Sequence, residues 1–405
     1  MKAPRGTFDV LPEDGRTRLE LLQDSRELMG RALYDYVETP IFEDTELFAR
    51  GVGESTDVVQ KEMFTFEDKA ARSLTLRPEG TASICRAYVE HGMHKRPQPV
   101  KVWYWGPFFR HEAPQAGRFR QFSQVGAEVL GTDEPSADAE LILLLDELLA
   151  GCSEVRLRLS SLGNAATRSA YRAELRDWLR AREGELSEPV RARLDLNPLR
   201  AFDSDDPGTQ AVMAEAPKLL DRLSDDDAAH FAEVRALLDT AGLEYELDPG
   251  LVRGLDYYTR TVFEFESGVL GAQAALGGGG RYDGLVELLG GPPTPGVGWA
   301  AGIERILLAG YLGESGNGPR VFVAVAKSER RREAFDVVRR LRGRGVAAEH
   351  DHTTRSLKGQ LKQADRLGAH YTVIMGDTLE VKEMATGEQR EVGEVADVLK
   401  AVGAA

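Results

Sequence analysis

Cysteine and histidine are scarce in this sequence. Of the 405 residues only Cys85 and Cys152 are cysteines, too few for a disulfide framework or a cysteine-rich zinc site. The seven histidines show no spacing typical of metal ligands, and no serine–histidine–aspartate set can be recognised. We therefore expect two free thiols, no metal site built from protein ligands and no hydrolase of the catalytic-triad type.

Long apolar segments are also missing. No run of 18 apolar residues occurs, so we expect no membrane-spanning helix. Residues 1–13 lack the apolar core of a secretory signal peptide. Hydrophobic residues make up 42% of the chain and charged residues 29%, which is too apolar for a disordered chain. These features predict a folded cytoplasmic protein that does not contact a membrane.

Charge is unevenly distributed along the chain. The formal net charge of −15 argues, on its own, against a partner rich in phosphate. Residues 319–405, however, carry 16 basic and 13 acidic side chains, a net +3, whereas the remaining residues carry 35 and 53, a net −18. Seven arginines of the C-terminal part are Arg330, Arg331, Arg332, Arg339, Arg340, Arg342 and Arg344. They form either an ordinary solvated helix face or a docking surface for a polyanion.

The first part of the chain has the spacing of both helices and strands. Apolar residues recur at three and four positions over 21–33, which predicts a helix. A second apolar helix is expected over 136–149, and a further one is expected to start near Trp299. The predicted strands are 100–109, 118–130 and 261–266.

The composition changes twice along the rest of the chain. Between 164 and 247 aromatic and β-branched residues become rare, and we expect a helical insertion in which Ser224 caps a helix. Residues 313–319 have the composition of a linker. Beyond them strands and helices alternate, which predicts a small domain with a parallel sheet.

Candidate chemistry is densest around the polar loop 111–117. Because alternate side chains of a strand point to one face, even-numbered residues after this loop share a face, and Val125, Ala127 and Val129 pack inward. The shared face carries Arg118, Arg120, Phe122, Gln124 and Glu128. An exposed sheet face could show the same pattern. With Arg110 at the end of the preceding strand, however, three arginines at the root of one hairpin would suit phosphate oxygens.

Three further clusters combine glycine with charged or aromatic residues. The segment 253–258 reads R-G-L-D-Y-Y; adjacent tyrosines on a strand face opposite ways, so at most one need serve a site, and either could be a core residue. Four glycines at 277–280 imply close approach of the backbone to a ligand or to another element. Arg305 lies near a helix start, where its charge does not complement the helix dipole, so it is either paired or directed at an anion.

Five segments together resemble the histidyl-tRNA synthetases, a family of class II aminoacyl-tRNA synthetases. They read T-L-R-P-E-G-T, F-F-R-H-E-A-P-Q-A-G-R-F-R-Q-F-S-Q-V-G-A-E-V, R-G-L-D-Y-Y-T-R-T-V-F-E, G-G-G-R-Y-D-G-L and G-V-G-W-A-A-G-I-E-R. The resemblance covers nearly the whole chain, and R-G-L-D-Y-Y is peculiar to the histidine enzymes. It implies an α+β fold with an antiparallel catalytic sheet and flanking helices (1–163 and 248–312), a helical insertion (164–247) and a C-terminal α/β anticodon-binding domain (319–405). It also implies a homodimer, with residues 32–40 at its interface.

The activity implied by this resemblance is that of a histidine–tRNA ligase. The histidine carboxylate would attack the α-phosphate of ATP, and the terminal ribose of tRNA(His) would then attack the adenylate. Because the first step brings two anions together, positive groups must stabilise the developing charge. By resemblance, Arg110 and Arg253 are the catalytic residues at the α-phosphate. Arg118 and Arg305 would bind the outer phosphates, which Mg²⁺ would bridge, and Phe122 would stack on adenine.

A histidine pocket is implied as well. By resemblance it consists of Glu79, Gly80, Thr81, Arg110, Gln124, Glu128, Arg253, Tyr257 and Tyr258. Glu128 and Tyr258 would bind the two imidazole nitrogens, and a buried site with both partners rejects a ring that lacks either nitrogen. One departure is Ala113, which stands where the bacterial motif often has arginine. Gln115 remains as a residue that would contact the tRNA acceptor end.

Two other functions are compatible with parts of the pattern. A non-catalytic, histidine-sensing regulatory subunit of ATP phosphoribosyltransferase would typically lack the anticodon-binding domain and the arginine of R-G-L-D-Y-Y. This chain has Arg253 and residues 319–405, which disfavours that alternative. A class II synthetase for another amino acid is disfavoured because Glu128 together with R-G-L-D-Y-Y suits imidazole.

Overall fold

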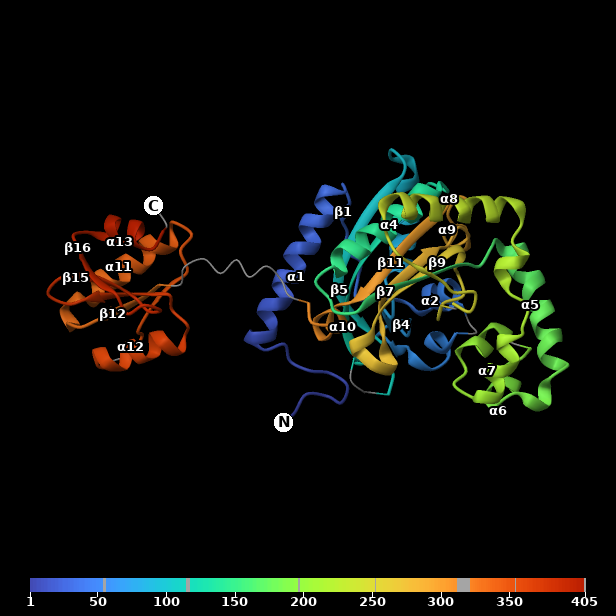
Figure 1. Cartoon of the computed structure of the whole chain (residues 1–405), viewed down its shortest axis with the longest axis horizontal. Helices are drawn as coiled ribbons and strands as arrows, with labels where there is room; N and C mark the ends of the chain where they lie inside the picture. The colour runs from blue at the N-terminus through green and yellow to red at the C-terminus, as the bar shows by residue number, and fades with distance from the viewer. Residues whose placement is uncertain are drawn as a thin grey trace. The chain divides into compact units, whose positions relative to one another are not determined.

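A computed structural model of the chain describes residues 1–53, 56–113, 117–195, 197–251, 253–311, 321–353 and 355–403. The chain divides into two compact units, residues 1–313 and 314–405 (Figure 1). The first unit contains a large sheet and the second a smaller one. Within the described ranges, no helix has both the length and the apolar character needed to cross a membrane.

The first unit is built around an eight-stranded sheet with the order β1-β5-β6-β11-β10-β9-β7-β8. Its strands are β1 (Asp35–Tyr36), β5 (Val100–Phe109), β6 (Gln121–Leu130), β7 (Val155–Ser161), β8 (Glu246–Leu247), β9 (Thr259–Ser267), β10 (Ala275–Arg281) and β11 (Gly296–Gly302). The six inner strands pair antiparallel, and the short strands β1 and β8 pair in parallel at the two edges. The sheet is therefore mainly antiparallel.

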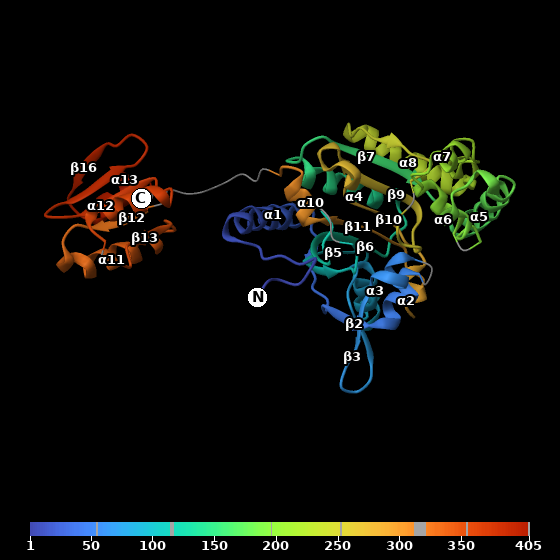
Figure 2. The ribbon, with the colours of Figure 1, turned by 90° about the horizontal axis from the view of Figure 1, so that it is seen from below.

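Helices cover both faces of this sheet (Figure 2). One face packs against α1 (Pro12–Arg31), α4 (Pro135–Leu149), α8 (Asp225–Ala241) and α10 (Ile303–Leu308) in the largest hydrophobic core. Val125, Ala127 and Val129 of β6 belong to this core, as their alternation predicts. The other face packs against α3 (Thr81–Glu90) and α9 (Leu285–Leu288), next to α2 (Thr45–Val52). On that face Phe122 and Gln124 of β6 line a cavity.

Two smaller groups of elements extend the first unit. A three-stranded sheet has the order β2-β4-β3, with β2 (Phe42–Asp44), β3 (Phe64–Glu67) and β4 (Ser73–Leu76), and its β3–β4 hairpin protrudes from the body (Figure 2). The helices α5 (Ala165–Arg180), α6 (Glu188–Arg191) and α7 (Pro207–Ala214) enclose a hydrophobic core of their own. These helices form the expected insertion.

The last helix of the segment 164–247 packs differently from the others. Ser224 caps α8, as expected, because its side chain accepts a hydrogen bond from the backbone N–H of Asp227. Phe231, Val234 and Leu238 of α8, however, are buried in the main core beside α4. The composition of α8 resembles that of the insertion, but its packing joins it to the eight-stranded sheet.

Two expectations about local structure are wrong. Trp299 does not lie at a helix start but inside strand β11, and the helix begins only at Ile303. This strand needs small residues because neighbouring side chains leave little room for larger ones. A Cβ at Gly298, for example, would lie 1.6 Å from Oε2 of Glu128. The strand expected from Arg118 begins at Gln121, since the residues before it still belong to the loop.

The second unit contains a five-stranded sheet with the order β13-β12-β14-β15-β16. Its elements are β12 (Val321–Val325), α11 (Arg331–Arg342), β13 (Ala348–His350), α12 (Leu357–Arg366), β14 (Tyr371–Met375), β15 (Leu379–Glu383), β16 (Gln389–Val392) and α13 (Val395–Ala401). β12, β13 and β14 form the predicted parallel sheet, and β15 and β16 extend it antiparallel. The antiparallel extension was not predicted.

Acidic neighbours accompany several arginines in α11 and directly before it. Arg330 pairs with Glu333, and both Arg339 and Arg340 pair with Asp336. These pairs offset the charge of three of the seven arginines.

Candidate active site

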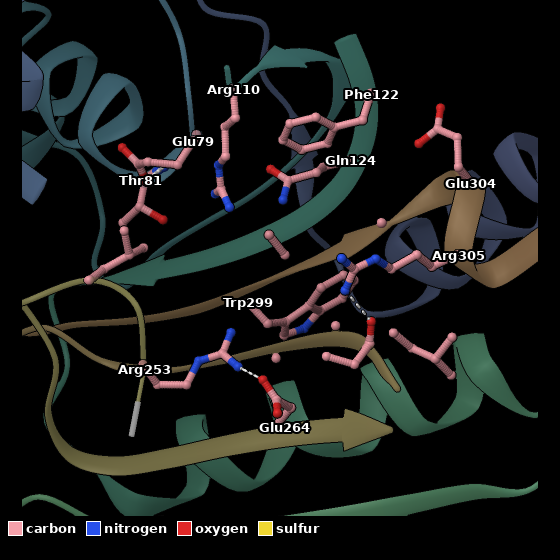
Figure 3. A pocket seen from close by; sticks show the side chains of 18 of the residues that line it. Glu79, Thr81, Arg110, Phe122, Gln124, Arg253, Glu264, Trp299, Glu304 and Arg305 are labelled. Atoms are coloured by element: carbon pink, nitrogen blue, oxygen red, sulfur yellow. Dashed lines mark hydrogen bonds and ion pairs between the residues drawn. The ribbon is translucent and has the colours of Figure 1, made fainter. Parts of the chain in front are cut away.

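A cavity of about 220 Å³ opens on the face of the large sheet that carries Phe122 and Gln124 (Figure 3). Its wall collects residues from the loop after β4, the β5–β6 hairpin, the segment before β9, and the strands β9, β10 and β11. Of the residues predicted from the sequence, the lining contains Glu79, Gly80, Thr81, Arg110, Arg118, Phe122, Gln124, Arg253, Tyr257, Tyr258 and Arg305. The fold therefore brings together segments more than 200 residues apart in the chain.

Glu79 lies at the start of α3. Its Oε2 accepts a hydrogen bond of 2.8 Å from the backbone N–H of Thr81, and its Oε1 accepts one of 2.9 Å from that of Ala82. A carboxylate here complements the positive end of the helix dipole. Burial nevertheless raises the pKa of Glu79, against the effect of these hydrogen bonds. The hydroxyl of Tyr257 donates a third bond of 3.3 Å, so Glu79 connects α3 with the R-G-L-D-Y-Y segment.

Arg110 projects into the cavity beside an aromatic ring. Its Nε donates a hydrogen bond of 2.9 Å to the carbonyl of Pro78, and its guanidinium carbon lies 5.4 Å from the centre of the Phe122 ring. Next to Phe122 on β6, Gln124 has a buried Oε1 without a hydrogen-bond partner among the described residues. Because buried acceptors are normally satisfied, this oxygen is available to a donor on a ligand.

Arg118 and Arg305 form a second cationic part of the wall. Arg305 donates from Nε to the carbonyl of Gly117 at 3.0 Å and from Nη1 to that of Ala275 at 2.8 Å. Arg118 has its Nε 3.1 Å from Oε2 of Glu112. Burial lowers the pKa of Arg305, and the positive charge of Arg118 lowers it further. Guanidiniums held so close together favour a bound anion.

Arg253 enters the cavity from the opposite side and forms an ion pair with Glu264 of β9 (Figure 3). Burial opposes its charge, but Glu264 outweighs that effect and raises the pKa of Arg253. The glycine run makes space for this pair. A Cβ at Gly278 would lie 3.1 Å from Nη1 of Arg253 and 2.5 Å from the carbonyl oxygen of Phe263. The glycines thus permit the close backbone approach that the sequence implied.

Tyr257 and Tyr258 lie in a turn before β9 rather than on a strand. Their ring centres are 4.7 Å apart, and both residues line the cavity. The expectation that at most one tyrosine need face the site, which assumed a strand, is therefore wrong. Burial raises the pKa of both hydroxyls, so both remain protonated hydrogen-bond donors at neutral pH.

Glu128 is buried directly behind the cavity and is not part of its wall. Its Oε1 accepts a hydrogen bond of 2.7 Å from the hydroxyl of Thr81, and its Oε2 accepts one of 2.7 Å from the hydroxyl of Tyr282. Burial raises the pKa of Glu128 to about 8, although both hydroxyls act in the opposite direction. Thr81 thus lies between this carboxyl group and the cavity.

Arg120 does not line the cavity: its side chain packs against Gly6, and its Nε donates to the carbonyl of Glu112 at 3.3 Å. Grouping it with Arg110 and Arg118 is therefore wrong, because β6 begins only after Arg120 and the alternation does not extend into the loop. Gln115 lies outside the described residues, whereas Ala113 is exposed.

The prediction from sequence missed several residues of the wall. Glu264 is the last residue of the segment R-G-L-D-Y-Y-T-R-T-V-F-E, so its place in a distinctive motif was the available signal. Glu304 accepts hydrogen bonds of 2.9 Å from Nη1 of Arg18 and from the backbone N–H of Ser123. No sequence pattern connects Arg18 with the site, because the contact depends on the packing of α1 against α10.

The cavity thus combines two chemistries in one space. Arg110, Arg118, Arg253 and Arg305 can bind a polyanion, and Phe122 offers a flat surface for an aromatic ring. Next to them, Gln124 and Tyr258 offer an acceptor and a donor for a small polar molecule. This arrangement suits a reaction between a nucleotide and a small zwitterion.

Comparison with known proteins agrees with this chemistry. The model of the histidyl-tRNA synthetase family matches residues 6–306, and that of an anticodon binding domain matches residues 320–403. The chain is 47% identical to the histidine–tRNA ligase of Rubrobacter xylanophilus, over 96% of each chain. It is also 47% identical to that of Streptomyces coelicolor, over 97% of this chain and 95% of that one.

Solved structures show the same similarity. The structure of apo histidyl-tRNA synthetase from S. aureus superposes with a TM-score of 0.82 and 37% identity, covering 99% of both chains. An ATP phosphoribosyltransferase regulatory subunit/histidyl-tRNA synthetase from Bacillus halodurans superposes with a TM-score of 0.67 at 24% identity, which shows a shared fold alone. With family models matching nearly its whole length and relatives at 47% identity, the chain belongs to the histidyl-tRNA synthetase family of class II aminoacyl-tRNA synthetases.

Proposed function

We propose that the protein is a histidine–tRNA ligase that activates L-histidine with ATP and transfers it to the 3′ end of tRNA(His). The observation that carries this proposal is a cavity with four guanidiniums around a binding place for a small polar molecule, in a chain of this family. The family uses ATP as a substrate. The first step forms a bond from the histidine carboxylate oxygen to the α-phosphorus and releases pyrophosphate.

The arginines would act by electrostatic stabilisation. Arg110 and Arg253 approach the cavity from opposite sides, which suits two contacts to the α-phosphate (Figure 3). Charge develops on its oxygens as the carboxylate attacks, and fixed cations stabilise that charge without reorganising. Arg118 and Arg305 would bind the β- and γ-phosphates, and Phe122 would stack on adenine with Arg305 on its other side.

Histidine would occupy the part of the cavity between β6 and the R-G-L-D-Y-Y segment. Glu79, Gly80, Thr81 and Gln124 are placed to bind its ammonium and carboxylate groups, and Tyr258 to donate to one imidazole nitrogen. Glu128 would bind the other nitrogen if Thr81 releases its Oε1. A site with both partners would reject rings that lack either nitrogen.

The residues present do not form a metal site built from protein ligands. Glu79, Glu264 and Glu304 are engaged with backbone amides or arginines, and no group of three potential ligands occurs among the described residues. We propose that Mg²⁺ enters with the ATP phosphates, because this ion usually keeps several waters and binds through substrate phosphates.

The two compact units would have different functions. We propose that residues 1–163 and 248–312 form the catalytic domain, that 164–247 contain the insertion and that 319–405 bind the anticodon. Because α8 packs in the main core, the functional part of the insertion would end before Ser224. We also propose a cytoplasmic homodimer with residues 32–40 at its interface, and a contact of Gln115 with the tRNA acceptor end.

A histidine-dependent exchange assay tests this function. The purified protein should exchange labelled pyrophosphate into ATP when histidine is present and should then charge tRNA(His). A regulatory subunit would bind histidine without exchange, and a synthetase of different specificity would respond to another amino acid. Either result would overturn the proposal.

A further inference from the structure

The R-G-L-D-Y-Y-T-R segment, residues 253–260, contacts both the insertion and the main body of the first unit. Tyr258 belongs to the hydrophobic core that α5 and α7 enclose, together with Tyr171 and Leu175 of α5, and Tyr257 packs against the same core. The insertion therefore supports part of one wall of the cavity.

A polar contact reinforces this packing. Arg168, in the first turn of α5, donates a hydrogen bond from Nη1 to the backbone carbonyl oxygen of Tyr258. Burial lowers the pKa of Arg168, whereas the carboxylate of Asp256 in the same segment favours its charge. Arg168 itself does not line the cavity. It contacts the main chain of Tyr258 and not its hydroxyl, which interacts with Tyr257 and Arg253.

The end of the segment is fixed by the residues that border the insertion. Arg260 has a φ of +48°, in the left-handed region that non-glycine residues rarely adopt. It exchanges backbone hydrogen bonds of 2.7 Å with Leu162 and Gly163, and its Nε lies 3.0 Å from Oδ1 of Asp227. Asp227 also accepts a 2.9 Å bond from the backbone N–H of Asn164, the N-cap of α5.

These contacts carry one inference, which rests on the proposed function. We propose that Arg168 is a positioning residue for the histidine pocket: it acts through the carbonyl of Tyr258 and fixes the hydroxyl of that residue relative to the bound imidazole. The insertion then determines the shape of the amino-acid site directly. A movement of α5 would change histidine binding, even though no side chain of α5 reaches the cavity.

Replacement of the arginine tests the inference. Arg168→Met removes the donor and keeps most of the side-chain length. In pyrophosphate exchange without tRNA, it should raise the KM for histidine about tenfold, the usual effect of losing a hydrogen bond from a charged group, and leave the KM for ATP nearly unchanged. Arg168→Lys, which keeps a charged donor, should recover part of the loss. Arg180→Met is the matched control, because Arg180 lies on the same helix, pairs with Asp195 and is 53% exposed.

A double-mutant cycle separates positioning from general destabilisation. If Arg168 acts through Tyr258, Arg168→Met should add little to the KM for histidine when Tyr258→Phe is already present. Additive effects would overturn the inference, as would equal changes in the KM for histidine and for ATP. If Arg168→Met does not fold, the same comparison is made with Arg168→Lys. Absence of histidine-dependent exchange in the unaltered protein would instead refute the proposed function.

Discussion

Tyr282 donates a hydrogen bond of 2.7 Å to Oε2 of Glu128, and both side chains are buried. Tyr282 belongs to the segment G-G-G-R-Y-D-G-L and follows directly after β10, from where it reaches Glu128 across the intervening strand β11. The glycines of β11 make this reach possible, because a side chain at Gly296 or Gly298 would occupy the space that Tyr282 and Glu128 fill. Tyr282 thus holds the carboxyl group of Glu128, which is proposed to bind imidazole, from the side away from the cavity.

Tyr282→Phe should destabilise the protein and weaken histidine binding. The substitution leaves Oε2 of Glu128 without its donor, and an unsatisfied buried acceptor costs about 1–3 kcal/mol. Urea unfolding should report this loss, and pyrophosphate exchange should show a higher KM for histidine. Tyr245→Phe is the control, because the hydroxyl of Tyr245 donates to Asp239 at an exposed position, so its loss should change the free energy of unfolding by less than about 0.5 kcal/mol. Equal effects of both substitutions would contradict the prediction.

Glu128 should make stability depend on pH. The folded state raises its pKa from 4.5 to about 8, so between these values the folded protein holds a proton that the unfolded chain has released. The free energy of unfolding should therefore fall as pH rises from about 4.5 to about 8, by an amount on the order of a few kcal/mol. Glu128→Gln should remove this part of the dependence, as measured by urea unfolding across that range. Parallel curves for the two proteins would refute the assignment.

Gly298→Ala should disturb the site from inside the sheet. Its Cβ would lie 1.6 Å from Oε2 of Glu128, so the carboxyl group or the strand must move, and such overpacking typically costs about 1–3 kcal/mol. Thermal unfolding and the KM for histidine should both change. Gly284→Ala provides the comparison, because no atom lies within 4 Å of its added Cβ. A Gly298→Ala protein that matches Gly284→Ala in both measurements would show that Glu128 is not confined.

Arg253→Ala should slow activation without abolishing folding. Loss of a cation that stabilises the transition state should reduce kcat for pyrophosphate exchange about 10²–10³-fold. Arg156→Ala serves as control, because Arg156 is on the same sheet but is 65% exposed and remote from the cavity. A near-normal rate for Arg253→Ala would remove this residue from the chemistry.

The two units should be separable by truncation. Residues 1–313 form a compact unit that contains the whole cavity, so this fragment should retain histidine-dependent pyrophosphate exchange. Charging of tRNA(His) should fall far more, because the proposed anticodon-binding domain is missing. Measurement of both activities on the fragment and the full chain checks this. Equal loss of both activities would mean that residues 314–405 support the catalytic fold.

Periodicity predicted the regular parts of the fold well. The bounds of β5 agree with the expected strand 100–109, because the apolar stretch ends there at a polar residue. It failed at β11, whose glycines and alanines resemble a loop leading into a helix around Trp299. Small residues there reflect crowding by side chains from neighbouring strands, which a single segment does not reveal.

Sequence motifs predicted the residues of the site better than composition did. They did not predict the contacts between those residues. Arg110, Arg253 and Arg305 lie in distinctive segments and meet in one cavity. Glu264 went unrecognised because its importance depends on the side chain opposite it. Glu128 was expected on the wall and lies behind it, since Thr81 occupies the nearer position. Such contacts depend on packing between strands, and the spacing of residues along one strand does not predict them.

Main-chain carbonyls, rather than carboxylates, anchor two of the cavity's guanidiniums. Arg110 bonds to the carbonyl of Pro78, and Arg305 bonds to those of Gly117 and Ala275. A carbonyl fixes a guanidinium without cancelling its charge, so mutual repulsion among the cations persists in the folded chain. A polyphosphate relieves that repulsion when it enters. Nucleotide binding should therefore raise the free energy of unfolding of the first unit, because the bound phosphates relieve the repulsion between the guanidiniums.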